Sequence, residues 1–283
     1  MKILIIGANG QLGSDMVKLL KDKFEVIPLT DKDIDIGDEK NQKDVIIPIK
    51  PDIIVNCAAY TNVPDCEINK QIAFNVNGYA LKELSIISNK LNSHLIHFST
   101  DYVFDGLKKK PYIESDFPNP LNTYGISKYV GEIYVKNYCK KYSIIRVSGL
   151  YGINPSPLKK NFIEVILSKV KKNEKIEIVD DQFLTPTWTY YVAKQTLKII
   201  EHKIEGIIHS TCEGETNWYE FAKAIFEILG INVNITPVKT KMDEFVKRPL
   251  YSVLENSVLK NEGINIMPHW KDALKEYLKI KFG

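Results

Sequence analysis

The stretch KILIIGANGQLG at residues 2–13 joins a short apolar run directly to three glycines. The run at residues 2–7 is too short for a helix and rich in isoleucine, which is typical of a strand buried on both faces of a parallel sheet. Apolar residues then recur three or four apart from Leu12 to Leu20, as in an amphipathic helix. The same apolar run is too short for a signal peptide or a membrane span. The stretch therefore predicts the strand, turn and helix that open an α/β domain.

The three glycines have the spacing Gly-x-x-Gly-x-x-Gly. Glycines at a strand-to-helix turn let the backbone approach a pyrophosphate, and the amino terminus of the helix favours that anion. An ordinary tight turn is the alternative, because a glycine triplet alone is a weak motif. The position between a predicted strand and a predicted helix favours dinucleotide binding. The residues expected to contact the cofactor here are Gly7, Asn9, Gly10, Gln11, Leu12 and Gly13.

The choice between NAD and NADP is expected to depend on the residues directly after the second predicted strand, which spans residues 25–29. An acid there accepts a hydrogen bond from the ribose 2′-hydroxyl of NAD, whereas a base binds the 2′-phosphate of NADP. Asp31 favours NAD and the adjacent Lys32 favours NADP, so both cofactors stay open. Asp35 and Ile36 are expected to lie against the adenine, with a polar loop before a helix as the alternative.

Short apolar runs alternate with longer amphipathic stretches through the first half of the chain. This alternation is typical of a doubly wound α/β domain with a parallel sheet, a Rossmann-type fold. Further strands are predicted at 52–56, 94–99 and 143–147, and helices from Asn69 to Leu91 and from Tyr124 to Tyr142.

The pattern becomes less regular after about Gly149. We expect residues 1–149 to form the dinucleotide-binding domain and residues 150–283 to form mainly a smaller substrate-binding lobe, with some later segments returning to the first domain. In this second part a strand is predicted at 175–179 and helices from Asn161 to Lys171 and near Tyr190 and Trp218.

The composition narrows the class of function. The 38 basic and 35 acidic residues are mixed along the chain, which argues against a nucleic-acid surface. Only Arg146 and Arg248 are arginines, so few guanidinium groups are available for bidentate phosphate binding. The four cysteines include no close pair and have no histidine cluster around them. We therefore expect no disulfide framework and no metal site, and a cytoplasmic protein that binds neither nucleic acid nor a membrane.

Tyr124 and Lys128 lie four residues apart in the sequence YGISK, which puts both on one face of a predicted helix. A phenol is a weak acid-base catalyst at neutral pH, but a cation beside it stabilises the phenolate and lowers the pKa. This pair suits carbonyl reduction: Tyr124 gives a proton to the developing alkoxide, and Lys128 also can hold the nicotinamide ribose. A surface helix face is the alternative, because the chain has 15 tyrosines and many lysines and the spacing recurs by chance.

Hydroxyl groups at the end of the fourth predicted strand support the catalytic interpretation. Ser99 and Thr100 are placed at the carboxyl end of the sheet, where ligands of doubly wound folds bind. Thr100 is then expected to orient a substrate carbonyl by donating a hydrogen bond to it.

A series of distinctive motifs extends over nearly the whole chain. They are GANGQLG at 7–13, VNCAAYTNVPDCE at 55–67, STDYVF at 99–104, PLNTYGISKYVGE at 120–132, RVSGLYG at 146–152, DDQFLTPT at 180–187 and RPLYSVL at 248–254. Together and in this order they resemble the dTDP-4-dehydrorhamnose reductase family of extended short-chain dehydrogenases.

The resemblance implies reduction of the C4 keto group of a dTDP-linked 6-deoxyhexose to give dTDP-L-rhamnose, with Thr100, Tyr124 and Lys128 as the catalytic triad. It implies that Arg248 faces the nucleotide diphosphate, which suits a guanidinium group. Arg146 ends a core strand and is expected to be structural. The resemblance further implies sugar contacts from Asp101 and Tyr102, and cofactor contacts from Ala58, Ala59, Tyr60, Asn75 and Ser99.

Two positions depart from the family pattern. Gly149 stands where the family has a tryptophan packed near the sugar, and Leu184 stands where it often has a glycine. Loss of the aromatic side chain is expected to open the pocket to another sugar. The divalent ion found at a subunit contact in related reductases is not carried over, because no ligand cluster here supports it, and a homodimer stays open.

Two alternative functions are compatible with the same residues. One is a reductase or epimerase that acts on another nucleotide sugar. The other is a dinucleotide-binding regulatory subunit, like the β subunit of methionine adenosyltransferase. A regulatory subunit need not keep its catalytic residues, so the presence of Thr100, Tyr124 and Lys128 together favours an enzyme.

Overall fold

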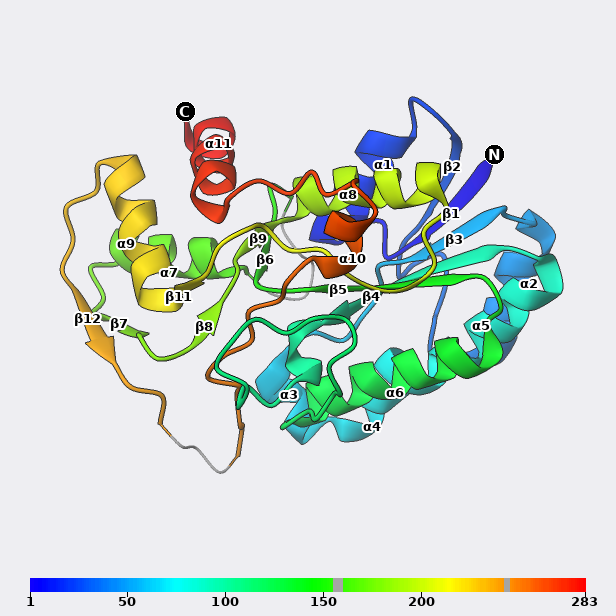
Figure 1. Ribbon diagram of the computed structural model, residues 1–283, viewed down its shortest axis with the longest axis horizontal. Helices are drawn as coiled ribbons and strands as arrows, with labels where there is room; N and C mark the ends of the chain where they lie inside the picture. The colour runs from blue at the N-terminus through cyan, green and yellow to red at the C-terminus, as the bar shows by residue number, and fades with distance from the viewer. Residues whose placement is uncertain (155–159, 242–244) are drawn as a thin grey trace.

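A six-stranded parallel sheet forms the centre of the computed structural model, which describes residues 1–154, 160–241 and 245–283 (Figure 1). Each neighbouring pair in this sheet is parallel, which confirms the predicted doubly wound fold. The strand order is β2 (Glu25–Leu29), β1 (Lys2–Ile6), β3 (Ile53–Asn56), β4 (His94–Thr100), β5 (Tyr142–Val147) and β10 (Gly206–His209).

Helices cover both faces of the sheet (Figure 1). Ile3 and Ile5 of β1 face a core shared with α1 (Gln11–Leu20) and α8 (Thr189–His202), whereas Leu4 and Ile6 face the opposite core. That second core includes α2 (Glu39–Ile49), α5 (Ala80–Leu91) and α6 (Thr123–Tyr138). Alternate residues of one strand are thus buried on opposite faces, as the continuous apolar runs predict. No helix in the described ranges combines the length and apolarity needed to cross a membrane.

Two predicted helices have different boundaries in the structure. The helix expected from Tyr124 to Tyr142 ends at Tyr138, because Cys139 adopts extended backbone and Tyr142 already pairs with Leu95 of β4. The helix expected over residues 69–91 is divided into three. It consists of α4 (Lys70–Phe74), a π-helical turn η1 (Asn75–Tyr79) and α5.

Two shorter helices near the site and one helix at the end of the chain were not predicted from the sequence. They are α3 (Val63–Ile68), η2 (Asp101–Val103) and α11 (Trp270–Phe282). Helix α2, also without an assigned range, contains Pro48 near its end and is capped by the Asp38 side chain. Proline weakens the helical signal of that segment.

Small two-stranded sheets and helices follow β5 and lie beside the central sheet, at the left of Figure 1. Two elements from late in the chain belong to the central sheet and its cover. Strand β10 is an edge strand of the central sheet, and helix α8 packs on one face of that sheet. The remaining elements are β6 (Leu150–Tyr151) with β9 (Thr187–Trp188), β7 (Ile176–Val179) with β12 (Ile235–Val238), β8 (Phe183–Leu184) with β11 (Thr216–Asn217), α7 (Phe162–Lys171), α9 (Trp218–Leu229) and α10 (Ser257–Asn261).

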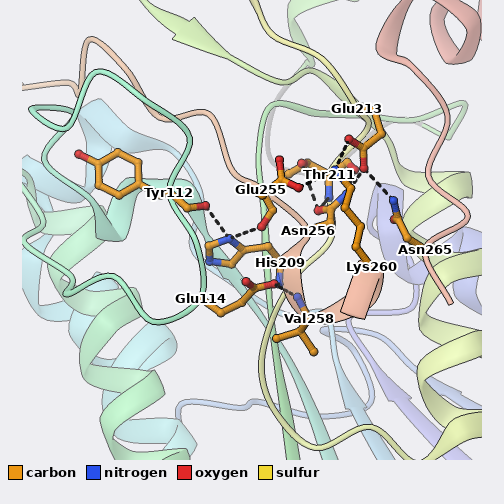
Figure 2. A network of polar contacts seen from close by, with 10 residues as sticks. All are labelled: Tyr112, Glu114, His209, Thr211, Glu213, Glu255, Asn256, Val258, Lys260 and Asn265. Atoms are coloured by element: carbon orange, nitrogen blue, oxygen red, sulfur yellow. Dashed lines mark hydrogen bonds and ion pairs between the residues drawn. The ribbon is translucent and has the colours of Figure 1, made fainter. Parts of the chain in front are cut away.

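A polar network holds the outer edge of β10 (Figure 2). The Glu114 carboxylate accepts hydrogen bonds from the backbone N–H groups of His209 and Val258, each at 3.1 Å. The His209 ring points its Nδ1 at two backbone carbonyls, those of Tyr112 and Glu255, also at 3.1 Å. Because both partners only accept, Nδ1 carries the ring hydrogen. The network fastens two distant segments, residues 112–114 and 255–258, to the edge strand.

Candidate active site

One cavity of about 970 Å³ extends along the carboxyl ends of the parallel strands and onto the smaller carboxy-terminal elements. Most residues predicted for the site line it, whereas Gly13, Lys32 and Asn75 do not. The predicted residues that line it are Gly7, Asn9, Gly10, Gln11, Leu12, Asp31, Asp35, Ile36, Ala58, Ala59, Tyr60, Ser99, Thr100, Asp101, Tyr102, Tyr124, Lys128 and Arg248.

The glycine loop is shaped as a close-packed cradle. Gly7 has a φ of +78°, and a Cβ there would lie 2.8 Å from the Ala58 backbone nitrogen. A Cβ on Gly13 would lie 2.1 Å from the Gly7 carbonyl oxygen, so Gly13 allows α1 to pack on the loop and does not line the cavity. Helix α1 begins directly after Gly10, and its free N–H groups lie beside the cavity. These features fit the pyrophosphate of a dinucleotide.

An acidic group faces the cavity after β2. Asp31 lines the wall and accepts a hydrogen bond from the Asn9 side chain at 2.9 Å. Lys32 is exposed, and its backbone N–H donates to the Thr30 hydroxyl. Asn75 donates to the Gly37 carbonyl and so supports the loop that follows the acidic residues.

Tyr124 and Lys128 lie one turn apart near the start of α6, and both line the cavity. The Lys128 side chain is only 2% exposed. Its Nζ donates to the Phe98 carbonyl at 2.6 Å and lies 3.2 Å from His97 Nε2. The side-chain nitrogen of Lys128 is therefore held against β4 by the Phe98 carbonyl, a partner that the spacing in the sequence does not reveal.

Burial raises the pKa of Tyr124, and the Thr100 hydroxyl acts in the opposite direction. The net direction is opposite to the lowering expected from the Tyr-x-x-x-Lys spacing. Burial is the main reason, and Nζ of Lys128 donates to the Phe98 carbonyl and lies beside His97. Tyr124 thus keeps its proton at neutral pH, as a proton donor must.

Asp101 gathers three hydroxyl groups at the end of β4. Its Oδ1 accepts from Thr100 at 3.0 Å, and its Oδ2 accepts from Ser148 at 2.8 Å and Ser252 at 2.6 Å. Burial raises the pKa of this carboxyl, and the three hydroxyls lower it. The Thr100 hydrogen that was expected to orient a substrate carbonyl is donated to Asp101 in this structure.

Arg248 and Tyr102 meet on the cavity wall. Nη1 of Arg248 donates to the Tyr102 hydroxyl at 3.3 Å, and the Tyr102 ring contacts Tyr124 edge-on with centroids 6.0 Å apart. Asn122 strengthens this link, because its Oδ1 caps α6 at Gly125 and its Nδ2 donates to the Lys247 carbonyl. The arginine segment and the catalytic helix are thus joined directly.

Arg146 is buried, with 1% of its surface exposed, and pairs with Glu132. Its Nε and Nη2 donate to the two carboxylate oxygens at 2.9 and 2.7 Å. Ser99 donates to the same carboxylate at 2.5 Å. These contacts fit the structural role expected for Arg146 and fix the end of β4 against α6.

The two departures from the family pattern lie in contact. Gly149 has a φ of +53°, and a Cβ there would lie 2.8 Å from Cδ1 of Leu184 and 3.1 Å from Cα of Pro186. Leu184 therefore fills the space beside Gly149, and both residues line the cavity. The wall at this point is aliphatic and closed, rather than opened by the missing aromatic ring.

Part of the cavity wall comes from residues that no sequence motif marks. They belong to α7, the two residues before it, β7 and the start of α9, and Phe162 and Trp218 pack with ring centroids 4.5 Å apart. The apolar spacing predicted the helix α7, but it did not predict which face of α7 lines the cavity. These residues are Lys160, Asn161, Phe162, Val165, Ile166, Lys169, Ile176, Glu177, Ile178, Val179 and Trp218.

The combination of glycine cradle, hydroxyl-bearing strand end and Tyr-Lys helix occurs in a known family. The family model described as "RmlD substrate binding domain" matches residues 1–281. The chain belongs to this family. It is 37% identical over 280 residues to the spore coat polysaccharide biosynthesis protein SpsK of Bacillus subtilis. The matched region covers 98% of this chain and 97% of that protein. The resemblance inferred from the motifs is confirmed.

Solved structures of the family agree over the whole chain. A dTDP-4-dehydrorhamnose reductase from Clostridium acetobutylicum is 40% identical, with a TM-score of 0.93 and 99% of both chains covered. The dTDP-4-dehydrorhamnose reductase from Bacillus anthracis, in complex with NADP, is 34% identical, with a TM-score of 0.92 and 99% of both chains covered.

Proposed function

We propose that this chain reduces the C4 keto group of a nucleotide-linked 6-deoxyhexose with NADPH or NADH, with dTDP-4-dehydro-L-rhamnose as substrate and dTDP-L-rhamnose as product. One observation carries the proposal: Thr100, Tyr124 and Lys128 line the same cavity as the glycine cradle. Membership of the family supports it and makes the chain an oxidoreductase that uses a nicotinamide dinucleotide.

The residues that would hold the dinucleotide form one continuous part of the wall. The cradle and the start of α1 suit the pyrophosphate, and Asp31 suits a ribose hydroxyl. Ala58, Ala59 and Tyr60 continue that wall toward Lys128. When bound, the nicotinamide supplies the hydride.

The residues that would hold the nucleotide sugar form the rest of the wall. Arg248 lines the cavity near Tyr102 and suits the diphosphate, because a guanidinium group binds phosphate oxygens through two parallel hydrogen bonds. The aromatic and aliphatic residues of α7, together with Trp218, suit a base. We thus propose residues 1–149 as the dinucleotide-binding part and residues 150–283 as mainly substrate-binding.

Tyr124 is the proposed proton donor. Its raised pKa keeps the phenol protonated until the C4 oxygen becomes an alkoxide and takes the proton from Oη. The phenolate that remains is offset by the positive charge of Lys128 on the same helix face. Thr100 positions the substrate oxygen once its hydroxyl turns from Asp101, and Asp101 and Tyr102 contact the sugar.

The direct test uses the purified chain with dTDP-4-keto-6-deoxyhexose, the epimerase that precedes the reductase, and NADPH or NADH. Loss of absorbance at about 340 nm should accompany formation of dTDP-L-rhamnose, identified by NMR. Cofactor binding without turnover on any nucleotide keto-sugar would instead indicate a regulatory subunit.

A reductase or epimerase for another nucleotide sugar is the second candidate. The contact of Gly149 with Leu184 favours it, because an aliphatic wall presents a different surface to the sugar from an aromatic one. The same assay with UDP- and dTDP-linked keto-sugars, compared by kcat/KM, separates the two candidates.

We further propose that the enzyme works in the cytoplasm, where nucleotide sugars and reduced dinucleotides are available. A homodimer is the assembly to test first. Exposed apolar side chains over the α3–α6 side support it, among them Ile68, Ile72, Tyr79 and Ile133. Light scattering coupled to size exclusion would show the mass of a monomer if this proposal fails.

A further inference from the structure

A chain of buried polar groups runs behind Lys128. His97 of β4 has no exposed surface, and its Nε2 lies 3.2 Å from Lys128 Nζ. Its other ring nitrogen, Nδ1, lies 3.2 Å from Asn56 Nδ2 on the neighbouring strand β3. Asn56 Oδ1 in turn accepts from the backbone N–H of Ala58 at 3.1 Å. The chain thus connects the cofactor side of the cavity to Lys128.

The donor and the acceptor of each hydrogen bond in this series can be assigned by starting from Ala58. A backbone N–H only donates, so Ala58 fixes the Asn56 oxygen on its own side and turns the Asn56 NH₂ group to His97. The NH₂ group also only donates, so Nδ1 of His97 must accept. Burial and the nearby Lys128 hold the pKa of His97 well below its usual value. The neutral ring therefore carries its single hydrogen on Nε2.

This assignment points an N–H group at Lys128. A protonated lysine has three donors and no acceptor, so its ammonium and the Nε2–H of His97 face each other as two donors. A neutral amine would accept from Nε2–H through its lone pair. The bond from Nζ to the Phe98 carbonyl, at 2.6 Å, is available to both forms.

We propose that Asn56 and His97 are positioning residues that destabilise the ammonium form of Lys128, so that Lys128 exchanges its proton in the working pH range instead of remaining a fixed cation. The catalytic consequence rests on the proposed function, in which the Lys128 charge offsets the Tyr124 phenolate. The chain of hydrogen bonds itself does not depend on it.

The other groups around Lys128 act in both directions. Burial lowers the pKa of Lys128 to about 8, whereas Glu132 on the next turn of α6 and Cys57 after β3 raise it. The Glu132 carboxylate is already shared with Arg146 and Ser99. Burial raises the pKa of the Cys57 thiol, which stays neutral. His97 is then the group in contact whose hydrogen position decides the charge of Lys128.

The hydrogen position on His97 can be measured without any substrate. Long-range ¹H–¹⁵N correlation spectra of histidine-labelled protein, with His97 assigned by its replacement, distinguish the two neutral tautomers. Wild-type protein at pH 7 should show His97 with its hydrogen on Nε2. A hydrogen on Nδ1, or a charged ring, would overturn the proposal.

Asn56→Asp should reverse the direction of the hydrogen bond between residue 56 and His97 with little change in side-chain shape. A carboxylate accepts from both Ala58 and His97, so the ring hydrogen should move to Nδ1 and leave Nε2 to accept from the Lys128 ammonium. Asn77→Asp is the matched control, because Asn77 is also fully buried and bonds to Tyr60 and to Ser127 beside Lys128. It introduces a similar carboxylate and should leave the His97 tautomer unchanged.

The pH profile of kcat/KM then tests the effect on Lys128. The rate of reduction should fall as pH rises through the pKa of Lys128, since the cation is lost. In Asn56→Asp the pH at which kcat/KM falls should rise by about one unit or more. A shift of this size is expected when two facing donors, Lys128 Nζ and His97 Nε2, become a hydrogen-bonded pair. An unchanged pH for this fall, or an equal shift in Asn77→Asp, would overturn the proposal. Absence of turnover in wild-type protein would contradict the proposed function alone, because the spectra still decide the tautomer.

Discussion

The hydroxyl of Tyr124 is the group on which the proposed proton transfer depends. Tyr124→Phe should lower kcat by roughly two or more powers of ten, the usual contribution of a positioned general acid. The dissociation constant for NADPH should change little, because the glycine cradle is untouched. Stopped-flow or steady-state rates and a fluorescence titration check the two parts. A variant that turns over at the wild-type rate would remove Tyr124 from the chemistry.

Arg248 offers a guanidinium group whose replacement by lysine keeps the charge. Arg248→Lys should raise KM for the nucleotide sugar roughly tenfold, because one charge-assisted hydrogen bond of about 1.5 kcal/mol is lost. The kcat at saturation should stay within about threefold, since the diphosphate is bound equally in ground and transition states. An unchanged KM would place the diphosphate elsewhere in the cavity.

Single residues were predicted best where their function depends on local sequence. The glycine cradle needs only a strand before it and a helix after it, and both are present where the sequence predicts them. The pKa of Tyr124 was predicted in the wrong direction, because it depends on burial and on where Lys128 points. His97 was not singled out at all, since inside an apolar strand it reads as an ordinary core residue.

At the scale of elements, the start of α6 links the catalytic helix to the Arg248 segment. Asn122→Ala removes both the cap on Gly125 and the bond to the Lys247 carbonyl. We expect the free energy of unfolding to fall by about 1 kcal/mol, the usual value of a helix cap. We also expect KM for the nucleotide sugar to rise, because Arg248 loses a support.

Asn217→Ala is the control for this prediction. Asn217 caps α9 through the Glu220 N–H and has the same chemistry at a helix start. Urea unfolding should show a similar loss of stability in both variants, and KM should rise more in Asn122→Ala, because Asn217 affects the site only through the neighbouring Trp218. Equal effects on KM would mean that the link through Lys247 has no influence on the site.

Element boundaries show what a single sequence does not contain. The apolar spacing continues from Tyr138 to Tyr142, but the helix ends at Tyr138, and Tyr142 begins β5 by pairing with Leu95 of β4. The π-helical turn Asn75–Tyr79 keeps the same apolar spacing as the helices on either side of it. Both features depend on neighbours in space, so periodicity predicted the elements and missed these interruptions.

At the scale of the whole molecule, the cavity joins the sheet to the carboxy-terminal elements. A ligand that binds only the folded chain should stabilise both parts together, by about 2.7 kcal/mol at a hundred times its dissociation constant. Thermal unfolding with NADPH should therefore show one transition at a midpoint several degrees higher. Tyr124→Phe should keep this shift, because it leaves the cradle intact. Two separate transitions would show that the parts unfold independently.

The proposed substrate side of the cavity is the part that sequence alone did not locate. Phe162, Lys169 and Trp218 are brought together by the packing of α7 on β7 and α9, and no local motif marks them. Gly149 and Leu184 were each noted as departures, but their contact appears only in the folded chain. The fold, the family and the cofactor loop follow from patterns along the sequence, whereas the shape of the proposed sugar pocket depends on contacts between distant segments.

The fastening of β10 also decides how this molecule behaves toward its own copies. A parallel sheet ends in a row of unpaired amides that can recruit a strand from another chain and begin aggregation. Here the outward N–H of His209 is occupied by Glu114, and the same carboxylate holds the start of α10 in place beside it (Figure 2). This edge of the sheet is thus covered by its own chain, which opposes the addition of a strand from another copy at β10.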